Sequence, residues 1–493
     1  MPHSVVKARD RQRTPNIPTR EAVMRLILFD RAGPERLGFE PLAFSRPIWE
    51  LRFGMTSLGA KLLCRLCPWW KAEPGGSLPA AAALSAGGEA AAGGRAADAV
   101  SAGAQGLSVG CFVPDYMAAA YSAHTDWPVN DPALLCGDDL LLVHGRLKAD
   151  HFHWPLDGPS MLGVDSQGRV VAARIAAADL ERLDTSTIDT LLASAQQHLP
   201  TADQPLSAWN YTWELVLANA EQITADFGTM GRTGVEGVVE EPCPIRGNRK
   251  DVYIARGAVL HPMVVIDAEH GPVFIDEGAQ IHSFTRIEGP CYIGRGSILL
   301  GAKCREGNTI GPMCRVGGEV EESIIHGYSN KYHDGFLGHA YVGEWVNLGA
   351  LTTNSDLKND YTSVSVILDG RTPVDTGSTK VGALIGDHAK TSIGVLLNTG
   401  AYVGAMAIVA ATGKPLPKFI PSFAWFLEGV VTKGFGKKQL YETAKTVMSR
   451  RGCTWTAAEQ AMWDEVYNLT APVRNEAIKR GRRALAGGQG PQQ

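Results

Sequence analysis

Aliphatic residues recur at every sixth position over much of the second half of the chain. A period of six fits neither the 3.6-residue repeat of an α-helix nor the two-residue alternation of a β-strand. The series predicts a solenoid in which each unit forms one short strand, three units close a coil and the aliphatic side chain points inward. The small residue that often follows permits a tight corner. The aliphatic positions are Ile254, Leu260, Ile266, Ile275, Ile281, Ile287, Ile293, Leu299, Ile310, Val316, Val342, Leu348, Ile385, Leu397, Val403 and Val409, with Thr391 in one slot.

The part of the chain before these repeats has a different pattern. Residues 26–29 and 140–147 are apolar runs typical of buried strands, whereas residues 187–199 and 213–227 carry apolar side chains at helical spacing. Strands that alternate with helices predict an α/β layer domain.

Together these patterns divide the chain into consecutive parts. We predict a flexible extension over residues 1–23, an α/β domain over 24–250, an all-β parallel β-helix over 251–415 and a helical C-terminal extension over 416–493. The helical extension would cap the open end of the solenoid, where backbone groups lack partners. Residues 73–106 are almost all Ala, Gly and Ser. We predict a disordered insert there, because too few large apolar groups are present to offset the entropy of ordering.

The charge and hydropathy of the chain narrow the class of function. The formal net charge is -4 over 493 residues, which gives no electrostatic reason to bind nucleic acid or an anionic membrane. No apolar run approaches the roughly 18 residues that a membrane-spanning helix needs, and the first 23 residues lack the apolar centre of a secretory signal. We therefore expect a cytoplasmic enzyme whose partners are small molecules, with neither nucleic acid nor membrane among them.

Several segments resemble one known family. The hexads, together with residues 327–350, resemble the bifunctional sugar-1-phosphate nucleotidyltransferases and glucosamine-1-phosphate acetyltransferases, and look closest to a divergent bacterial branch. Residues 45–54 and 213–223 resemble the nucleotidyltransferase-like half of that branch. The resemblance implies a left-handed parallel β-helix, a homotrimer, acetyl-CoA as co-substrate and a role in nucleotide-sugar synthesis for the cell envelope, with a UDP-N-acetylglucosamine-type product.

His333 is the candidate catalytic residue. A transferase that acylates an amine needs a base to remove its proton, and a histidine that titrates near neutrality can serve. His333 lies where the hexads are interrupted, so it can project from the prism. By resemblance it occupies the position of the family's catalytic histidine.

Cations and amides near His333 are candidates for binding an amino sugar phosphate and the coenzyme. Asp356 stands where the family commonly has an asparagine, and Gly317 to Glu322 replaces the family's basic cluster, so the acceptor can differ from glucosamine-1-phosphate. We assign Lys380 and Lys390 to the phosphates of the coenzyme. The substrate-binding candidates are Arg315, Lys331, Asn347, Asn354, Asp356 and Lys358.

The first half departs from nucleotidyltransferases in its motifs. Residues 30–38 lack the glycine-rich loop that cradles a triphosphate, and Arg146 stands near the place of the aspartate that would hold Mg²⁺. We assign Arg46, Arg52 and Arg146 to the phosphates of a nucleotide such as UTP or dTTP, and ion pairs with carboxylates would explain them equally well.

Two alternatives stay open. The first half could be a degenerate domain, in which case the protein would be a sugar-nucleotide sensor or scaffold without turnover. Related hexapeptide solenoids bind zinc through histidines and hydrate carbon dioxide. The second alternative is therefore a zinc-dependent hydratase, suggested by His326, His339 and His388. One hexad of separation places His333 and His339 on neighbouring faces of a coil, so we assign no metal ligand.

Overall fold

The computed structural model describes residues 24–67, 71–74 and 107–486, apart from 151, 153, 156, 412 and 428. The predicted flexible extension over 1–23 and nearly all of the predicted insert over 73–106 lie outside the described residues. None of the helices within the described ranges combines the length and the apolar character needed to cross a membrane.

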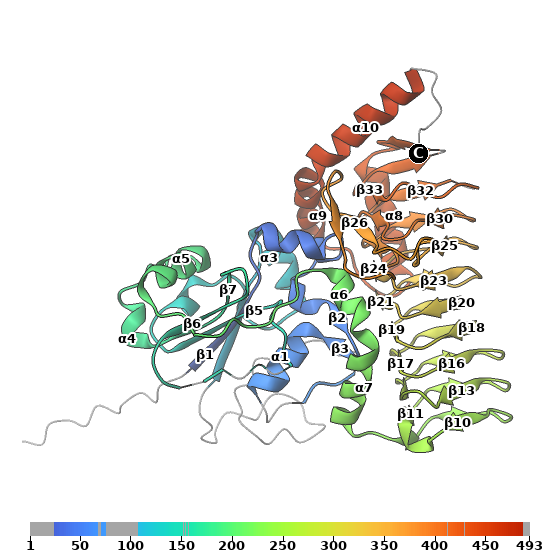
Figure 1. The fold of residues 1–493 in the computed structure, drawn as a ribbon, viewed down its shortest axis with the longest axis horizontal. Coiled ribbons are helices and arrows are strands. Elements are labelled where there is room, and N and C mark those ends of the chain that lie inside the picture. Colours follow the sequence, from blue (N-terminus) through green and yellow to red (C-terminus); the bar gives the residue numbers. More distant parts are fainter. Residues whose placement is uncertain are drawn as a thin grey trace, which may run out of the picture.

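The N-terminal part is an α/β domain around a mixed five-stranded sheet (Figure 1). Strands β4, β1 and β5 are parallel, and β7 and β6 continue the sheet in antiparallel orientation. Both faces of β1 are covered: Leu26 and Leu28 enter one apolar cluster, whereas Ile27 and Phe29 enter another. The order across the sheet is β4 (Leu107–Phe112), β1 (Met24–Phe29), β5 (Leu140–His144), β7 (Val170–Ile175) and β6 (Met161–Val164).

Short helices and turns surround this sheet. Ser57 caps α1 through its side chain, and Thr187 forms a reciprocal capping box at the start of α5. The helices of the domain are α1 (Leu58–Leu66), α3 (Asp115–Tyr121), α4 (Ala177–Leu180), α5 (Ile188–His198), α6 (Thr212–Leu217) and α7 (Asn219–Met230), with 3₁₀ turns η1 (Pro34–Phe39), η2 (Leu42–Phe44), η3 (Ile48–Glu50) and η4 (Pro132–Leu135) and the small hairpin β2 (Arg52–Phe53) and β3 (Thr56–Ser57).

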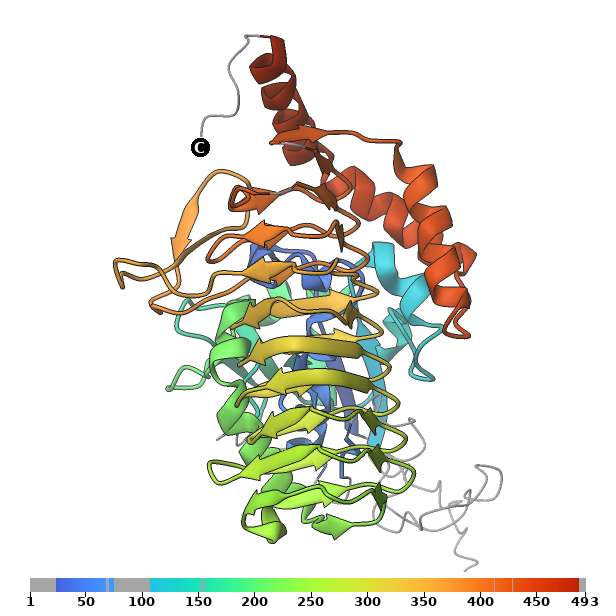
Figure 2. The same ribbon diagram turned by 90° about the vertical axis from the view of Figure 1, so that its right-hand side faces the viewer.

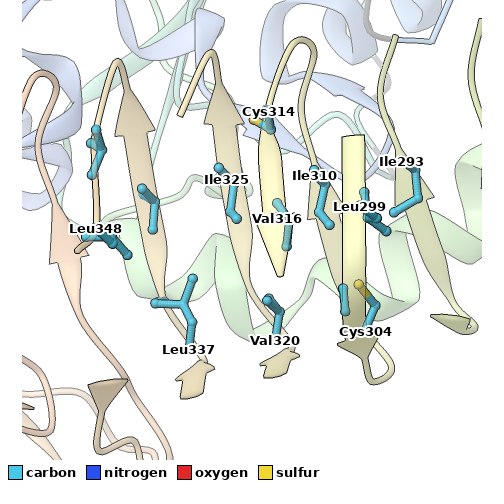
Figure 3. Packing of buried hydrophobic residues seen from close by; sticks show 14 of the residues in the cluster. Ile293, Leu299, Cys304, Ile310, Cys314, Val316, Val320, Ile325, Leu337 and Leu348 are labelled. Carbon is cyan, nitrogen blue, oxygen red and sulfur yellow. The ribbon is translucent and has the colours of Figure 1, made fainter. Parts of the chain in front are cut away.

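The second half is the predicted parallel β-helix, in which short strands stack coil upon coil (Figure 2). One face is a continuous parallel sheet in which each aliphatic residue lies in register with the next. The ladder is Ile254, Ile275, Ile293, Ile310, Ile325, Val342, Ile385, Val403 and Ile420. These side chains are at most 2% exposed and belong to one apolar cluster inside the prism. Figure 3 shows Ile293, Ile310 and Ile325 of this ladder. Every aliphatic position of the predicted series is buried.

The strands of that face are β8 (Gly234–Val235), β11 (Val252–Ile254), β14 (Val273–Ile275), β17 (Cys291–Ile293), β19 (Asn308–Ile310), β21 (Ile324–Gly327), β24 (Tyr341–Glu344), β28 (Leu384–Ile385), β31 (Tyr402–Val403) and β33 (Phe419–Ile420). The remaining coil strands are β9 (Val238–Val239), β10 (Ile245–Gly247), β12 (Val259–Leu260), β13 (Val265–Ala268), β15 (Gln280–Ile281), β16 (Arg286–Glu288), β18 (Ile298–Cys304), β20 (Arg315–Glu321), β22 (Asn330–Lys331), β23 (Phe336–Gly338), β25 (Thr353–Asn354), β29 (Lys390–Thr391), β30 (Leu396–Leu397), β32 (Ile408–Ala410), β34 (Trp425–Leu427) and β35 (Val430–Thr432). A 3₁₀ turn, η5 (Arg249–Asp251), precedes β11.

The solenoid extends beyond the expected range of 251–415 on both sides. Strand β8 pairs in parallel with β11, and β33 and β34 pair with β31 and β32. The first extension continues the aliphatic series, which the sequence prediction overlooked: Val235, Val239 and Ile245 lie in register with Ile254, Leu260 and Ile266. The second is obscured in the sequence by prolines between Lys414 and Ser422, although Ile420 keeps the inward register.

Two excursions leave the coil. Between Val342 and Ile385 the chain forms an antiparallel hairpin of β26 (Ser365–Ile367) and β27 (Pro373–Asp375). The C-terminal helices α8 (Lys437–Ser449), α9 (Ala457–Leu469) and α10 (Ala471–Ala486) follow β35. Helix α10 lies against β35 at the end of the solenoid, whereas α9 packs against α3 of the first domain (Figures 1 and 2). The helical extension therefore also joins the two halves.

Candidate functional site

A cavity of about 440 Å³ surrounds His333 on the outer surface of the solenoid. Of the predicted site residues, it gathers His333, Arg315 and Asn347. Its lining is Arg315, Asn330, Tyr332, His333, Asn347, Leu348, Gly349, Ala350, Ile393 and Arg451. A larger cavity of about 690 Å³ lies beside α1 and α7, and none of the predicted site residues lines it.

The local sequence explains why His333 projects. Strand β22 ends at Lys331 and β23 begins at Phe336, so His333 lies in the turn between them and is exposed. Its ring makes an edge contact with Tyr332 at 5.7 Å between ring centroids. A polar ring outside the prism, next to a cavity, is accessible to a substrate amine.

Lys331 holds this turn from inside the coil. It lies in register with Val316, so it occupies an inward position where the other coils have an aliphatic residue. Its Nζ donates to the carbonyl oxygens of Gly317 at 2.8 Å and His333 at 2.6 Å. Burial lowers the pKa of Lys331 to about 8. Lys331 therefore contacts the backbone of His333 rather than the cavity.

The polar wall of the cavity is a chain of three side chains. Arg451, from the turn between α8 and α9, donates from Nη2 to Oδ1 of Asn330 at 3.2 Å. Asn330 in turn donates from Nδ2 to Oδ1 of Asn347 at 3.3 Å. Arg315 donates from Nη1 to the carbonyl oxygens of Gly296, Met313 and Cys314.

Asp356 belongs to a different cluster, centred on His339. His339 is buried between two carboxylates, with Nδ1 2.8 Å from Asp356 Oδ2 and Nε2 2.8 Å from Glu322 Oε2. Burial lowers the pKa of His339, but the hydrogen bonds to Asp356 and Glu322 outweigh it and raise the pKa to about 9. The positively charged His339 thus links three coils.

The other predicted substrate residues also have partners within the chain. Asn354 accepts from the N–H of Gly338 at 2.9 Å and donates to its carbonyl oxygen at 2.9 Å, which fixes one coil to the next. Lys358 bonds Thr362 and lies 3.6 Å from Asp360. None of these residues lines the described cavity.

The two predicted coenzyme-binding lysines lie apart from His333 as well. Lys380 Nζ is 3.5 Å from Glu321 Oε1 at the solenoid surface. Lys390 is largely buried, and its Nζ donates to the carbonyl oxygens of Trp345 and His388 at 3.3 Å each. Burial lowers its pKa to about 8. Their role toward a coenzyme stays a prediction.

The arginines predicted to bind a nucleotide are buried in the first domain and at its junction with the solenoid. Arg46 pairs with Asp387, and Arg52 donates from Nε to the carbonyl oxygen of His326 at 2.6 Å. Arg146 Nη2 is 2.6 Å from Asp165 Oδ2. Their present partners are groups of this chain, and their nucleotide role stays a prediction.

The residues at the expected Mg²⁺ position do not fit the ion. After β1, Asp30 is buried and paired with Arg36. At the end of β5 stand His144 and, two residues on, Arg146, and burial together with Arg146 holds the pKa of His144 well below its usual range. Asp139 lies at the other end of β5, paired with Arg174. A divalent cation would need carboxylate oxygens that arginines occupy here.

The histidines of the zinc alternative are each engaged separately. His326 bonds Glu344 through Nδ1 at 3.1 Å and the carbonyl oxygen of Glu50 through Nε2 at 3.0 Å, while His339 lies between Glu322 and Asp356. His388 is buried beside the aromatic rings of Trp345 and Trp463. Within the described ranges, no group of three His, Cys, Asp or Glu side chains could hold a metal ion.

Seven lining residues were not predicted as site residues: Asn330, Tyr332, Leu348, Gly349, Ala350, Ile393 and Arg451. The first six lie within three residues of predicted site residues, so the interrupted hexads could have indicated them. Arg451 is far away in the sequence and reaches the cavity only because α8 and α9 fold back along the solenoid. No spacing in the sequence signals this contact.

No family model matches the chain, but curated proteins do. The bifunctional protein GlmU of Jannaschia sp. is 39% identical over 111 residues, 22% of this chain and 24% of that protein. A bifunctional sugar-1-phosphate nucleotidylyltransferase/acetyltransferase of Sulfurisphaera tokodaii is 38% identical over 149 residues, 28% of this chain and 35% of that protein. GlmU of Nitratidesulfovibrio vulgaris is 30% identical over 174 residues, which are 34% of this chain and 33% of that protein.

Two solved structures also align. A hexapeptide transferase family protein from Anaplasma phagocytophilum matches with a TM-score of 0.13 and 14% identity, over 44% of this chain and 90% of that one. The UDP-N-acetylglucosamine acyltransferase of Arabidopsis matches with a TM-score of 0.17 and 10% identity, over 52% and 98%. TM-scores this low do not support any conclusion about fold or function. The matches to the three curated relatives cover only 24% to 35% of the length of those proteins. Over that part of its length, the chain is similar to the bifunctional sugar-1-phosphate nucleotidylyltransferase/acetyltransferases, as the sequence motifs indicate.

Proposed function

We propose that the protein is an acetyltransferase that uses acetyl-CoA to N-acetylate an amino sugar-1-phosphate. The observation that carries the proposal is the exposed His333 in a cavity whose wall includes two arginines and two asparagines. A base, cations for a phosphate and amides for sugar hydroxyls are the groups that this reaction needs. The curated relatives that are named as acetyltransferases support the same reaction class.

In the proposed mechanism His333 is the general base. It accepts a proton from the substrate amine as the nitrogen bonds to the thioester carbonyl carbon. The carbon–sulfur bond then breaks, and the proton passes to the thiolate of CoA. Ala350 lines the cavity, and its backbone N–H donates no hydrogen bond within the described part of the chain. We assign this N–H to the oxyanion that forms during the attack.

The remaining assignments concern the whole protein. We propose a cytoplasmic homotrimer that supplies a precursor of a UDP-N-acetylglucosamine-type product. We also propose that the first domain transfers a nucleotidyl group from UTP or dTTP, because the relative from Sulfurisphaera tokodaii is named as a nucleotidylyltransferase. The carboxylates expected to hold Mg²⁺ are paired with arginines, so we derive no step through that ion.

A second candidate is favoured by those same ion pairs. With Asp30 bound to Arg36 and Arg146 bound to Asp165, the first domain would serve as a scaffold or sugar-nucleotide sensor without turnover. The solenoid would then be the only one of the two domains with an enzymatic activity.

Mass spectrometry of products separates the candidates. The purified protein is incubated with acetyl-CoA and glucosamine-1-phosphate, and separately with UTP or dTTP, a sugar-1-phosphate and Mg²⁺. We expect an N-acetylated sugar phosphate in the first reaction. A nucleotide sugar in the second would overturn the scaffold reading, and absence of product in the first, across several amino sugar phosphates, would overturn the acetyltransferase.

A further inference from the structure

Two arginines line the cavity of His333 from different parts of the chain. Arg315 comes from β20 of the solenoid, and Arg451 comes from the turn between α8 and α9. Burial lowers the pKa of Arg315, and the nearby charge of Arg451 lowers it further. Like charges held this close repel each other unless an anion lies between them.

The chain itself supplies no such anion. Neither arginine forms an ion pair with any carboxylate in the described ranges. Arg315 donates to the carbonyl oxygens of residues 296, 313 and 314, and Arg451 donates to the side-chain oxygen of Asn330. The other buried arginines discussed above, Arg46 and Arg146, each pair with an aspartate. The positive charges of the half-buried Arg315 and Arg451 are therefore not balanced by a carboxylate of the described residues.

The turn that carries Arg451 is fixed rather than loose. The N–H groups of Arg451 and Cys453 donate to the carbonyl oxygen of Met448 at 2.9 and 3.0 Å. Thr456 then starts α9 with a reciprocal capping box to Glu459. Trp455, between them, packs against Tyr441 of α8 and His388 of the solenoid. Arg451 is thus preorganised at the cavity, which lowers the entropic cost of binding.

We propose that Arg315 and Arg451 form a phosphate subsite, in which the C-terminal helical extension completes the site on the solenoid. Guanidinium groups bind phosphate oxygens with paired, charge-assisted hydrogen bonds. This inference rests on the proposed function for the identity of the ligand, since both the amino sugar phosphate and CoA carry phosphoryl groups. The subsite itself requires only that a phosphate compound bind there.

Binding measured without turnover tests the subsite. Glucosamine-1-phosphate, CoA and inorganic pyrophosphate are titrated calorimetrically into the wild-type protein and into Arg451→Gln. Arg450→Gln is the matched control, because Arg450 is exposed on the same turn and lines no part of the cavity. We expect Arg451→Gln to weaken at least one phosphate ligand by about tenfold or more, as loss of a charge-assisted hydrogen bond does. Unphosphorylated glucosamine should bind equally to both proteins.

The pattern of losses identifies the source of the phosphate. Weaker binding of glucosamine-1-phosphate alone assigns the subsite to the acceptor, and weaker binding of CoA alone assigns it to the coenzyme. Equal affinity of wild type and Arg451→Gln for all three probes, or no binding of any of them to the wild type, overturns the proposal. An Arg451-dependent phosphate affinity in a protein that fails to acetylate would keep the subsite and reject the proposed function.

Discussion

At the scale of single residues, His339 is the clearest example of a titratable side chain whose hydrogen bonds stabilise the fold. It lies between Asp356 and Glu322 and is 2% exposed, so its charged form is held by two hydrogen bonds of 2.8 Å. The sequence suggested a zinc ligand in one reading and a substrate role for Asp356 in another. The structure instead pairs the two residues with each other, because the corner of one coil brings position 339 beside position 356 of the next.

This pair predicts a pH-dependent stability. The pKa of His339 is raised from 6.5 to about 9 in the folded protein, so folding favours the protonated form. Its contribution is fully present below about pH 6.5 and is lost as the pH rises through about 9, an effect of about 3 kcal/mol. Urea unfolding of wild type and His339→Gln between pH 5.5 and 9.5 measures it. A stability difference that does not change with pH would contradict the assignment.

At the scale of elements, the stacked coil explains why the hexads were predictive. An inward aliphatic residue recurs because each strand of every coil needs one on the side that faces the prism interior, and the register of β11, β14 and β17 shows this directly. Lys331 is an exception to this rule: it takes an inward position, whereas the sequence prediction assigned it to substrate binding. At the first end of the solenoid the prediction overlooked Val239 and Ile245, which continue the hexads, and at the other end prolines around β33 obscure them.

Two neighbouring leucines test the packing rule. Leu299 is fully buried in the prism, whereas Leu300 is 42% exposed on the same strand, β18. We expect Leu299→Ala to lower the free energy of unfolding by about 2–5 kcal/mol, because a buried cavity is left, and Leu300→Ala by less than about 1 kcal/mol. Chemical denaturation of both variants measures the difference. Equal losses would show that β18 does not pack as described.

At the scale of the whole molecule, the first domain and the solenoid share an apolar interface. Seven apolar residues between positions 39 and 58 enter a cluster with Ile324, Tyr341 and Tyr402 of the solenoid, and Arg46 reaches Asp387 across the junction. The motif over residues 45–54 resembled a nucleotide site in the sequence. Its burial at this junction could not be predicted, because partners about 300 residues away supply it.

Removing Arg46 tests the junction. Asp387 would remain buried and Glu344 half-buried without their cation, so we expect Arg46→Ala to destabilise the protein by about 3–5 kcal/mol. Arg31→Ala is the control, since Arg31 and its partner Asp189 are 36% and 64% exposed and such a pair contributes about 0–1 kcal/mol. Thermal unfolding followed by circular dichroism compares them. Equal stability of the two variants would mean that the Arg46 pair does not hold the halves together.

The central claim is that His333 is the base of an acetyl transfer in its cavity. The most direct measurement is the rate of CoA thiol release from acetyl-CoA and glucosamine-1-phosphate by wild type and by His333→Ala. His333 is exposed in a turn, so the variant should keep its thermal stability. We predict a loss of kcat by about 10²–10⁴, the typical contribution of a general base. A His333→Ala protein that releases thiol as fast as wild type would contradict the account.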